Sequence, residues 1–133
     1  MENILTLLVL IDWLANDVHY AVDTTKNFYA RHLLADRVRD FGSAEDDIKE
    51  KYYLGFRNEL PPGDDVIAGY AIKAKKDLQG DALQRLCGAL SLLSGTVEAV
   101  GREELPRGVQ NVLDDISSRS LTYHFLCSKE MMS

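Results

Sequence analysis

The sequence predicts an all-α fold of four amphipathic helices. Apolar residues recur at three- and four-residue intervals in four stretches, at about residues 3–22, 28–54, 83–100 and 107–127. Neither an alternating run of β-branched residues nor an Asn-Gly or Asp-Gly hairpin signal occurs. The second and third stretches are joined by the longest link, residues 55–78. The expected architecture is therefore a four-helix bundle with a long crossover between its second and third helices.

The first two helices are separated by the sequence "DTTKN". Within it, Asn27 is a good N-cap for the second helix, and Gly55 is expected to end that helix. Gly42 lies in the middle of the second helix and costs about 1 kcal/mol relative to alanine, which calls for a packing reason. The expected core positions of these two helices are Ile4, Leu7, Leu8, Ile11, Leu14, Val18, Val22, Leu34, Val38, Phe41, Ile48 and Tyr52.

The link contains the turn "NELPPGDD", in which Asp64 or Asp65 is expected to cap a short amphipathic helix ending near Ile72. The fourth helix is expected to begin after Pro106. The core positions predicted for the last two helices are Leu83, Leu86, Cys87, Leu90, Leu93, Val97, Val100, Val109, Val112, Leu113, Ile116, Tyr123, Leu126 and Cys127.

Composition points to one cytoplasmic domain spanning residues 1–133. The net charge of −6 disfavours binding to nucleic acid or to anionic membranes. The apolar run "ILTLLVLIDWLA" follows an acid, contains Asp12 and has no basic start, so we interpret it as a core helix and not as a signal peptide or membrane span. Trp13 is expected to fill a subunit contact. The two cysteines, 40 residues apart, are expected to be reduced and buried.

The polar face of the second helix carries metal-binding residue types in register. At about 100° per residue, with His32 at zero, Asp36 falls near +40°, Asp46 near −40° and Glu50 near zero. Imidazole and carboxylate are ligands for iron, manganese and zinc. An ordinary solvated face is the alternative, and Arg39, which lies on the same side, favours it.

The two halves of this face are too far apart to share an ion within one chain. About 14 residues, or roughly 21 Å of helix, separate the His32/Asp36 pair from the Asp46/Glu50 pair. Two antiparallel copies of the helix would bring one pair opposite the other, crossing near Gly42 and Ser43, whose small size permits close approach. His19, at the end of the first helix, could complete each shared site.

These motifs resemble the Dps-like mini-ferritins of the ferritin-like superfamily. The matching segments are His19–Tyr20, "NFYARHLLAD" with His32 and Asp36, and "DDIKEKYYLG" with Asp46 and Glu50. The resemblance implies a ferritin-like bundle that binds ferrous iron at sites shared by two subunits, oxidises it with oxygen or peroxide, and stores it in a closed homo-oligomeric shell. His19, His32 and Asp36 would hold one iron, and the partner's acids would hold or bridge the second.

Three departures from the family pattern bear on these expectations. The spacing between the two halves of the motif is one residue shorter than in the family, which makes Asp47 an alternative to Asp46. Arg39 adds a positive charge, and no lysine-bearing N-terminal extension is present, so DNA binding is not expected. The second hypothesis is a ferritin-like bundle without oxidation chemistry, acting as an assembly or interaction module.

Overall fold

The protein is helical throughout most of its described length. The computed structural model describes residues 2–18, 28–63, 65–67 and 81–132, and these ranges contain no β-strand. The all-α prediction is confirmed to that extent. Among the described helices, none is long and apolar enough to cross a membrane.

The first helical segment consists of α1 (Glu2–Trp13) and the wider π-helical turn η1 (Leu14–Val18). It is buried on nearly every side, not along one stripe. The prediction that Trp13 fills a subunit contact is wrong, because only 6% of its surface is exposed and it lies within the core of its own chain. The buried residues of this segment are Ile4, Leu7, Leu8, Val9, Leu10, Ile11, Trp13, Leu14 and Ala15.

The second helical segment is not one regular helix. It comprises α3 (Phe28–Val38), α4 (Phe41–Ile48) and the π-helical η2 (Lys49–Arg57). At the junction of α3 and α4 the backbone bonds tighten to three-residue spacing, as in the 3.1 Å bond from Asp40 N–H to the Arg37 carbonyl. The segment ends past Gly55, where Asn58 adopts a left-handed conformation with φ of 53°.

The last two helices are α6 (Ala82–Gly101) and α7 (Arg107–Met131). Asp81 and Gln84 form a capping box at the start of α6, each side chain accepting a 2.9 Å bond from the other residue's N–H. Helix α7 begins immediately after Pro106, as the sequence predicts. Residues 65–67 form one helical turn in the link that precedes α6.

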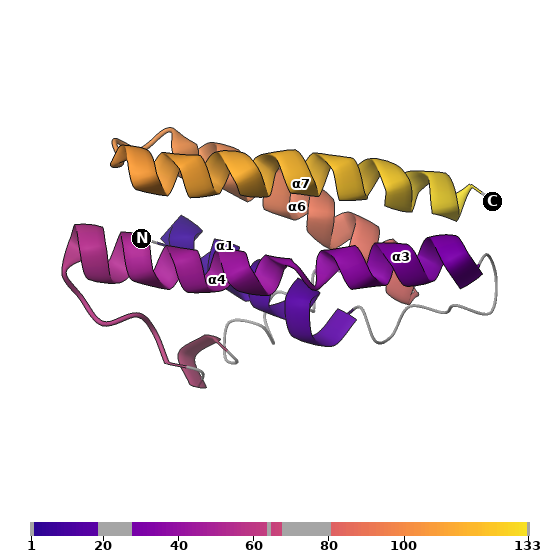
Figure 1. Ribbon diagram of the computed structural model, residues 1–133, viewed down its shortest axis with the longest axis horizontal. Helices are drawn as coiled ribbons and strands as arrows, with labels where there is room; N and C mark the ends of the chain where they lie inside the picture. The colour runs from indigo at the N-terminus through magenta and orange to yellow at the C-terminus, as the bar shows by residue number, and fades with distance from the viewer. Residues whose placement is uncertain (1, 19–27, 64, 68–80, 133) are drawn as a thin grey trace.

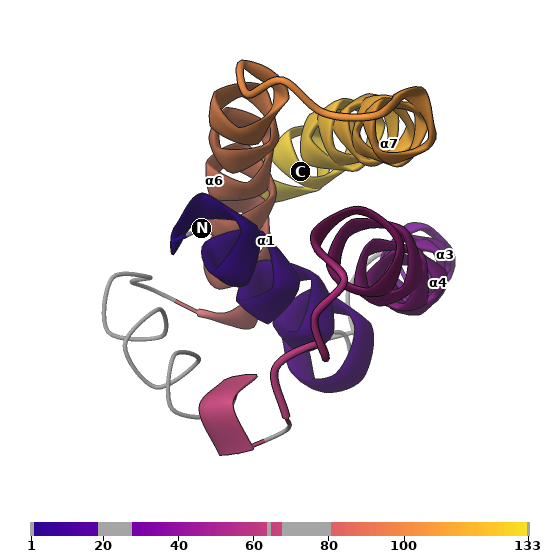
Figure 2. The same ribbon diagram turned by 90° about the vertical axis from the view of Figure 1, so that its left-hand side faces the viewer.

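The helices pack side by side around a common core (Figures 1 and 2). Helix α1 contacts α4 and α6, whereas α7 contacts α6, α3 and α4. The end of α7 lies against the start of both α3 and α6, because Glu130 pairs with Arg31 and Ser128 contacts Cys87. The start of α7 lies beside η2. Thus the second segment ends at one end of the molecule, and α6 begins at the other.

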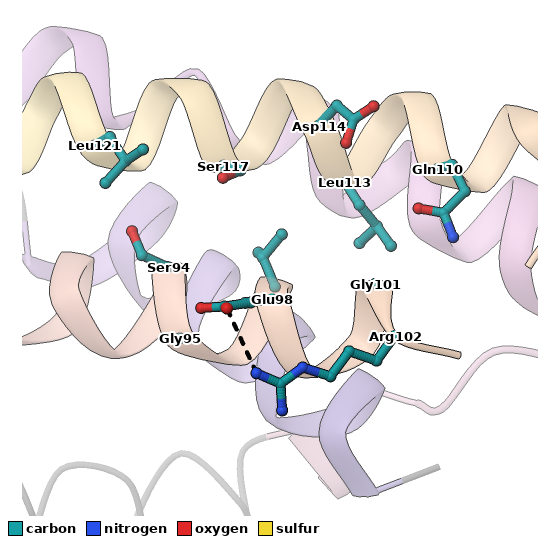
Figure 3. Close-up of a pocket in the computed structure, with 11 residues that line it drawn as sticks. Ser94, Gly95, Glu98, Gly101, Arg102, Gln110, Leu113, Asp114, Ser117 and Leu121 are labelled. Carbon is teal, nitrogen blue, oxygen red and sulfur yellow. Dashed lines mark hydrogen bonds and ion pairs between the residues drawn. The ribbon is translucent and has the colours of Figure 1, made fainter. Parts of the chain in front are cut away.

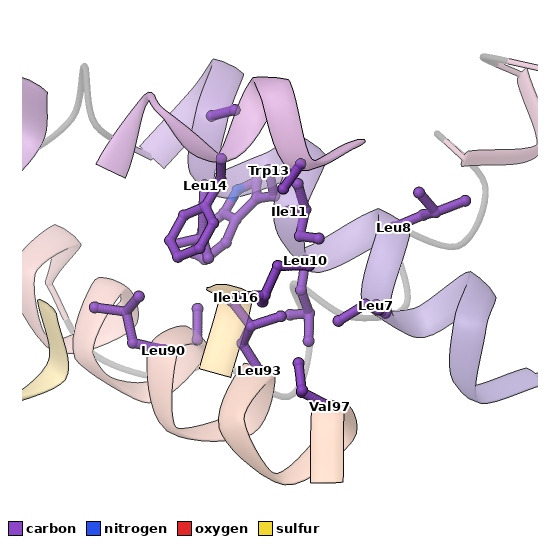
Figure 4. Packing of buried hydrophobic residues seen from close by; sticks show 14 of the residues in the cluster. Leu7, Leu8, Leu10, Ile11, Trp13, Leu14, Leu90, Leu93, Val97 and Ile116 are labelled. Carbon is purple, nitrogen blue, oxygen red and sulfur yellow. The ribbon is translucent and has the colours of Figure 1, made fainter. Parts of the chain in front are cut away.

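The core lies between these helices and contains the predicted apolar positions. In Figure 4, side chains of α1 and η1 face Leu90, Leu93 and Val97 of α6 and Ile116 of α7. Every predicted core position that the structure describes is buried, except Cys87 and Leu126, which are half-buried at its edge. Val18 and Val22 are not among the side chains described.

Candidate functional site

His32 and Asp36 lie together on the outward face of α3. Their side chains are 59% and 55% exposed, and His32 Nε2 is 3.6 Å from Asp36 Oδ2. The ring of Phe28 stacks on the imidazole of His32, with centroids 5.4 Å apart and planes 7° from parallel. This stacking limits rotation of the imidazole while leaving the pair accessible from solvent. The predicted one-turn pairing of these two residues is therefore present.

Arg39 is the competing partner of Asp36. Its Nη1 atom lies 4.0 Å from Asp36 Oδ1, so the carboxylate has an imidazole beside one oxygen and a guanidinium beside the other. Because all three side chains are more than half exposed, water screens these interactions and each contributes little to stability. A metal ion bound by Asp36 would either displace the Arg39 guanidinium or lie close to its positive charge.

The second pair of predicted ligands lies farther along the same helical segment. Asp46 is exposed on α4 and Glu50 is exposed on η2, whereas Asp47 is half-buried. Glu50 borders a hollow of about 630 Å³ between η2 and the start of α7. Lys51 also lines the hollow, so Glu50 has a basic neighbour.

No complete metal site is formed within the described part of one chain. In residues 2–18, 28–63, 65–67 and 81–132, no three His, Cys, Asp or Glu side chains are grouped closely enough to hold an ion. His19, the fifth predicted ligand, lies outside the described residues. The His32/Asp36 pair of one chain can be completed by the Asp46/Glu50 pair of another only if two chains assemble.

The small residue expected at a helix crossing has a neighbour in its own chain. A Cβ atom added to Gly42 would lie 3.8 Å from the Cβ of Ala15, at an ordinary van der Waals distance. Gly42 therefore faces η1 and is half-buried. Ser43, the next residue, is exposed, and its hydroxyl donates a 2.9 Å hydrogen bond to the Asp40 carbonyl. Of the two small residues, Ser43 is the one that faces outward.

Exposed apolar side chains lie at both ends of this helical segment. Phe28 and Tyr29 are 62% and 80% exposed at the start of α3, and Leu54 and Phe56 are 49% and 43% exposed on η2. Exposed aromatic residues on a helical face are typical of contact surfaces. In an antiparallel pair of these segments, the apolar start of one would meet the apolar end of the other.

A group of buried or half-buried charges that was not predicted as a site consists of Asp12 of α1, Glu45 of α4 and Lys49 of η2. Glu45 is only 8% exposed, and its Oε1 atom is 3.2 Å from Lys49 Nζ. Burial, and after it the neighbouring Asp12 carboxylate, raises the pKa of Glu45. The sequence does carry a signal, because Glu45 lies four residues after Phe41 and three before Ile48, on the apolar stripe.

A second charged pair connects the ends of α3 and α7. Arg31 Nε and Glu130 Oε1 are 3.3 Å apart, and both side chains are only 11% exposed. Such a pair resists separation, since removing one member leaves the other charge buried without compensation. It joins α3 to α7 one residue before His32.

A separate groove of about 510 Å³ runs between α6 and α7 (Figure 3). Ser94 and Glu98 extend from α6, and Ser117 and Asp114 extend from α7. Glu98 is paired with Arg102 at 3.4 Å on the α6 side. Of the predicted ligands that the structure describes, none lines this groove.

Comparison of the chain with protein families, curated proteins and solved structures finds no match.

Proposed function

We propose that this chain is a divergent Dps-like mini-ferritin: a cytoplasmic homo-oligomer that binds and oxidises ferrous iron at sites shared between two subunits. The fold proposed with it is a ferritin-like four-helix bundle with a long crossover. Supporting this topology, η2 ends beside the start of α7, whereas α6 begins beside the end of α7. Ends placed in this way are those that a long crossover would join.

The observation that carries the functional proposal is the exposure of both ligand pairs on one helical segment. His32 and Asp36 face outward at one end, and Asp46 and Glu50 are exposed toward the other. Each pair contains residue types that bind iron, yet each is too small to hold it alone. Two-fold pairing of the segments supplies the missing partners, because it sets the first pair of one chain against the second pair of the other.

In this proposal each residue has a defined task. His32 and Asp36, with His19, bind one ferrous ion as substrate, and Phe28 restrains the His32 ring. Asp46 and Glu50 of the partner subunit hold or bridge a second ion, with Asp47 as the alternative to Asp46. Oxygen or peroxide accepts the electrons lost by iron. The acidic chain, with its net charge of −6, favours accumulation of cations.

Anaerobic titration with ferrous iron, followed by calorimetry, tests the binding. The wild-type protein should bind about two ions per subunit, and His32→Ala should lose binding. His124→Ala is the matched control, because His124 is half-buried on α7 and is not part of the outward face. Absence of iron binding by the wild-type protein would refute the proposal.

The assembly half of the proposal has its own test. Ser43→Arg places a long charged side chain on the outward face at the proposed crossing, and the Ser43 hydroxyl bonds only locally to the Asp40 carbonyl. This variant should remain helical by circular dichroism but lose both the oligomer, measured by light scattering, and iron binding. A wild-type protein that is a stable monomer would exclude the shared site.

A second candidate function is a helical assembly or interaction module without oxidation chemistry. The contact between Arg39 and Asp36 favours it, because a positive charge at the ligand opposes metal binding. The exposed Phe28 and Tyr29 fit a contact surface equally well. An oligomer that Ser43→Arg disrupts but that binds no iron would establish this function instead.

A further inference from the structure

The two cysteines of the chain meet where the start of α6 lies against the end of α7. Cys87 Sγ is 3.5 Å from Ser128 Oγ, and Ser128 directly follows Cys127. Cys127 donates through Sγ to the Leu83 carbonyl at 3.5 Å, one helical turn before Cys87. With the side-chain contact between Cys127 and Cys87 themselves, these interactions place two thiols 40 positions apart in the sequence beside each other. Both cysteines are reduced in this structure.

The two thiols differ in their access to solvent. Cys127 is completely buried, and burial, followed by the neighbouring Cys87 thiol, raises the pKa of Cys127. Cys87 is half-buried at the edge of the core. A small oxidant therefore reaches Cys87 first, and Cys127 is positioned beside it as the second thiol.

We propose that Cys87 and Cys127 form a reversible intrachain disulfide when the protein is exposed to hydrogen peroxide. This inference is independent of the proposed iron chemistry, because it rests on contacts between α6 and α7 alone.

The reaction proceeds in two balanced steps. The Cys87 thiolate attacks one peroxide oxygen, the O–O bond breaks, and Cys87 becomes a sulfenic acid as the second oxygen leaves as water after protonation. The Cys127 sulfur then attacks the Cys87 sulfur, forming the S–S bond and breaking the S–O bond. The departing hydroxide takes the Cys127 proton. Overall, two thiols and one peroxide give one disulfide and two waters.

The bond would anchor the end of α7 against α6. Glu130 lies three residues after Cys127 and holds Arg31 of α3 in the largely buried ion pair at 3.3 Å. A covalent bond at Cys127 therefore fastens the part of α7 that positions α3. Closing a loop of about 40 residues also restricts the unfolded chain, which stabilises the folded state relative to it.

Mass spectrometry of the whole wild-type protein tests the bond directly. Reduced protein is incubated with peroxide, then denatured and alkylated. We expect a loss of about 2 Da, no alkylation, and a peptide pair joining Cys87 to Cys127 that reductant separates. The oxidised protein should also unfold at a Tm about 5–15 °C higher than the reduced protein.

Two controls distinguish a disulfide that depends on the folded structure from nonspecific oxidation of the thiols. In denaturant the disulfide should form much more slowly, because the helices no longer hold the thiols together. Cys127→Ser should convert Cys87 to oxygen adducts of about 16–48 Da instead of an intrachain bond. Intact thiols, disulfides only between chains, equal rates in folded and denatured protein, or a lower Tm after oxidation would each overturn the proposal.

Discussion

Replacing Gly42 by alanine distinguishes packing within the chain from packing against a second copy. Gly42 is the second residue of α4, its backbone lies outside the left-handed region, and an added Cβ would approach the Cβ of Ala15 at 3.8 Å. The methyl group would therefore enter a space that accepts it without displacing a neighbour. We expect Gly42→Ala to stabilise the folded chain.

The expected gain has two sources. Alanine is favoured over glycine in a helix by up to about 1 kcal/mol, less near a helix start. Partial burial of one methyl group against η1 adds a few tenths, since a fully buried methylene contributes about 0.8 kcal/mol. The free energy of unfolding should thus rise by about 0.5–1.5 kcal/mol. Urea denaturation followed by circular dichroism measures this, with an unchanged slope and a higher midpoint.

Gly95→Ala is the matched control, because Gly95 lies inside α6 with no atom within 4 Å of the added Cβ. The change in stability of Gly95→Ala measures the preference of a helix for alanine over glycine without a contact like that to Ala15. A fall in stability of Gly42→Ala, with a rise for Gly95→Ala, would mean that η1 and α4 approach more closely than described. If Gly42→Ala instead left the chain stable but dissociated an oligomer, the added methyl group would face a second copy, contrary to its contact with Ala15.

Three other perturbations follow from burial and charge. Burial raises the pKa of the Glu45 carboxyl above its ordinary value of 4.5. The stabilisation from protonated Glu45 is therefore complete below pH 4.5 and is lost as the pH rises through the raised pKa. Glu45→Gln should flatten this fall in the free energy of unfolding, measured by urea titrations at successive pH values. Leu93→Ala, at a fully buried position, should lower the free energy of unfolding by about 2–5 kcal/mol. The same change at Leu92, which is 42% exposed, should cost about 0.5 kcal/mol, and equal losses would contradict the described core. Removing the Arg39 charge 4.0 Å from Asp36 should tighten ferrous iron binding about 1.4- to 5-fold in calorimetry of Arg39→Gln, and weaker binding would assign Arg39 a supporting role.

The helices and their core positions were largely predictable because their signals are local. A helix repeats every 3.6 residues, so the sequence itself marks which side chains share a face. The end signals are also local, as with the Asp81–Gln84 capping box and the start of α7 after Pro106. The predicted turn pairing of His32 with Asp36 succeeded for the same reason.

The predictions that failed or remained incomplete concern contacts between helices. The spacing of Trp13 suggested an outer position, but packing by α4 and α6 covers α1 beyond its apolar stripe. Glu45 lies on the apolar stripe of α4, but the charged neighbours of its carboxyl group are Lys49 and, from another helix, Asp12. Gly42 was predicted to face a second copy, and its nearest neighbour is Ala15 of the same chain.

The sequence alone was sufficient to predict an acidic, mostly helical chain, most of its core positions, and the one-turn pairing of His32 with Asp36. The packed fold was needed to show which helices are neighbours, that Arg31 pairs with Glu130, and that Cys87 lies beside Cys127. The physical reason is the range of each interaction. Helical periodicity is set by residues three and four apart, whereas these contacts depend on the direction and packing of helices far apart in the chain.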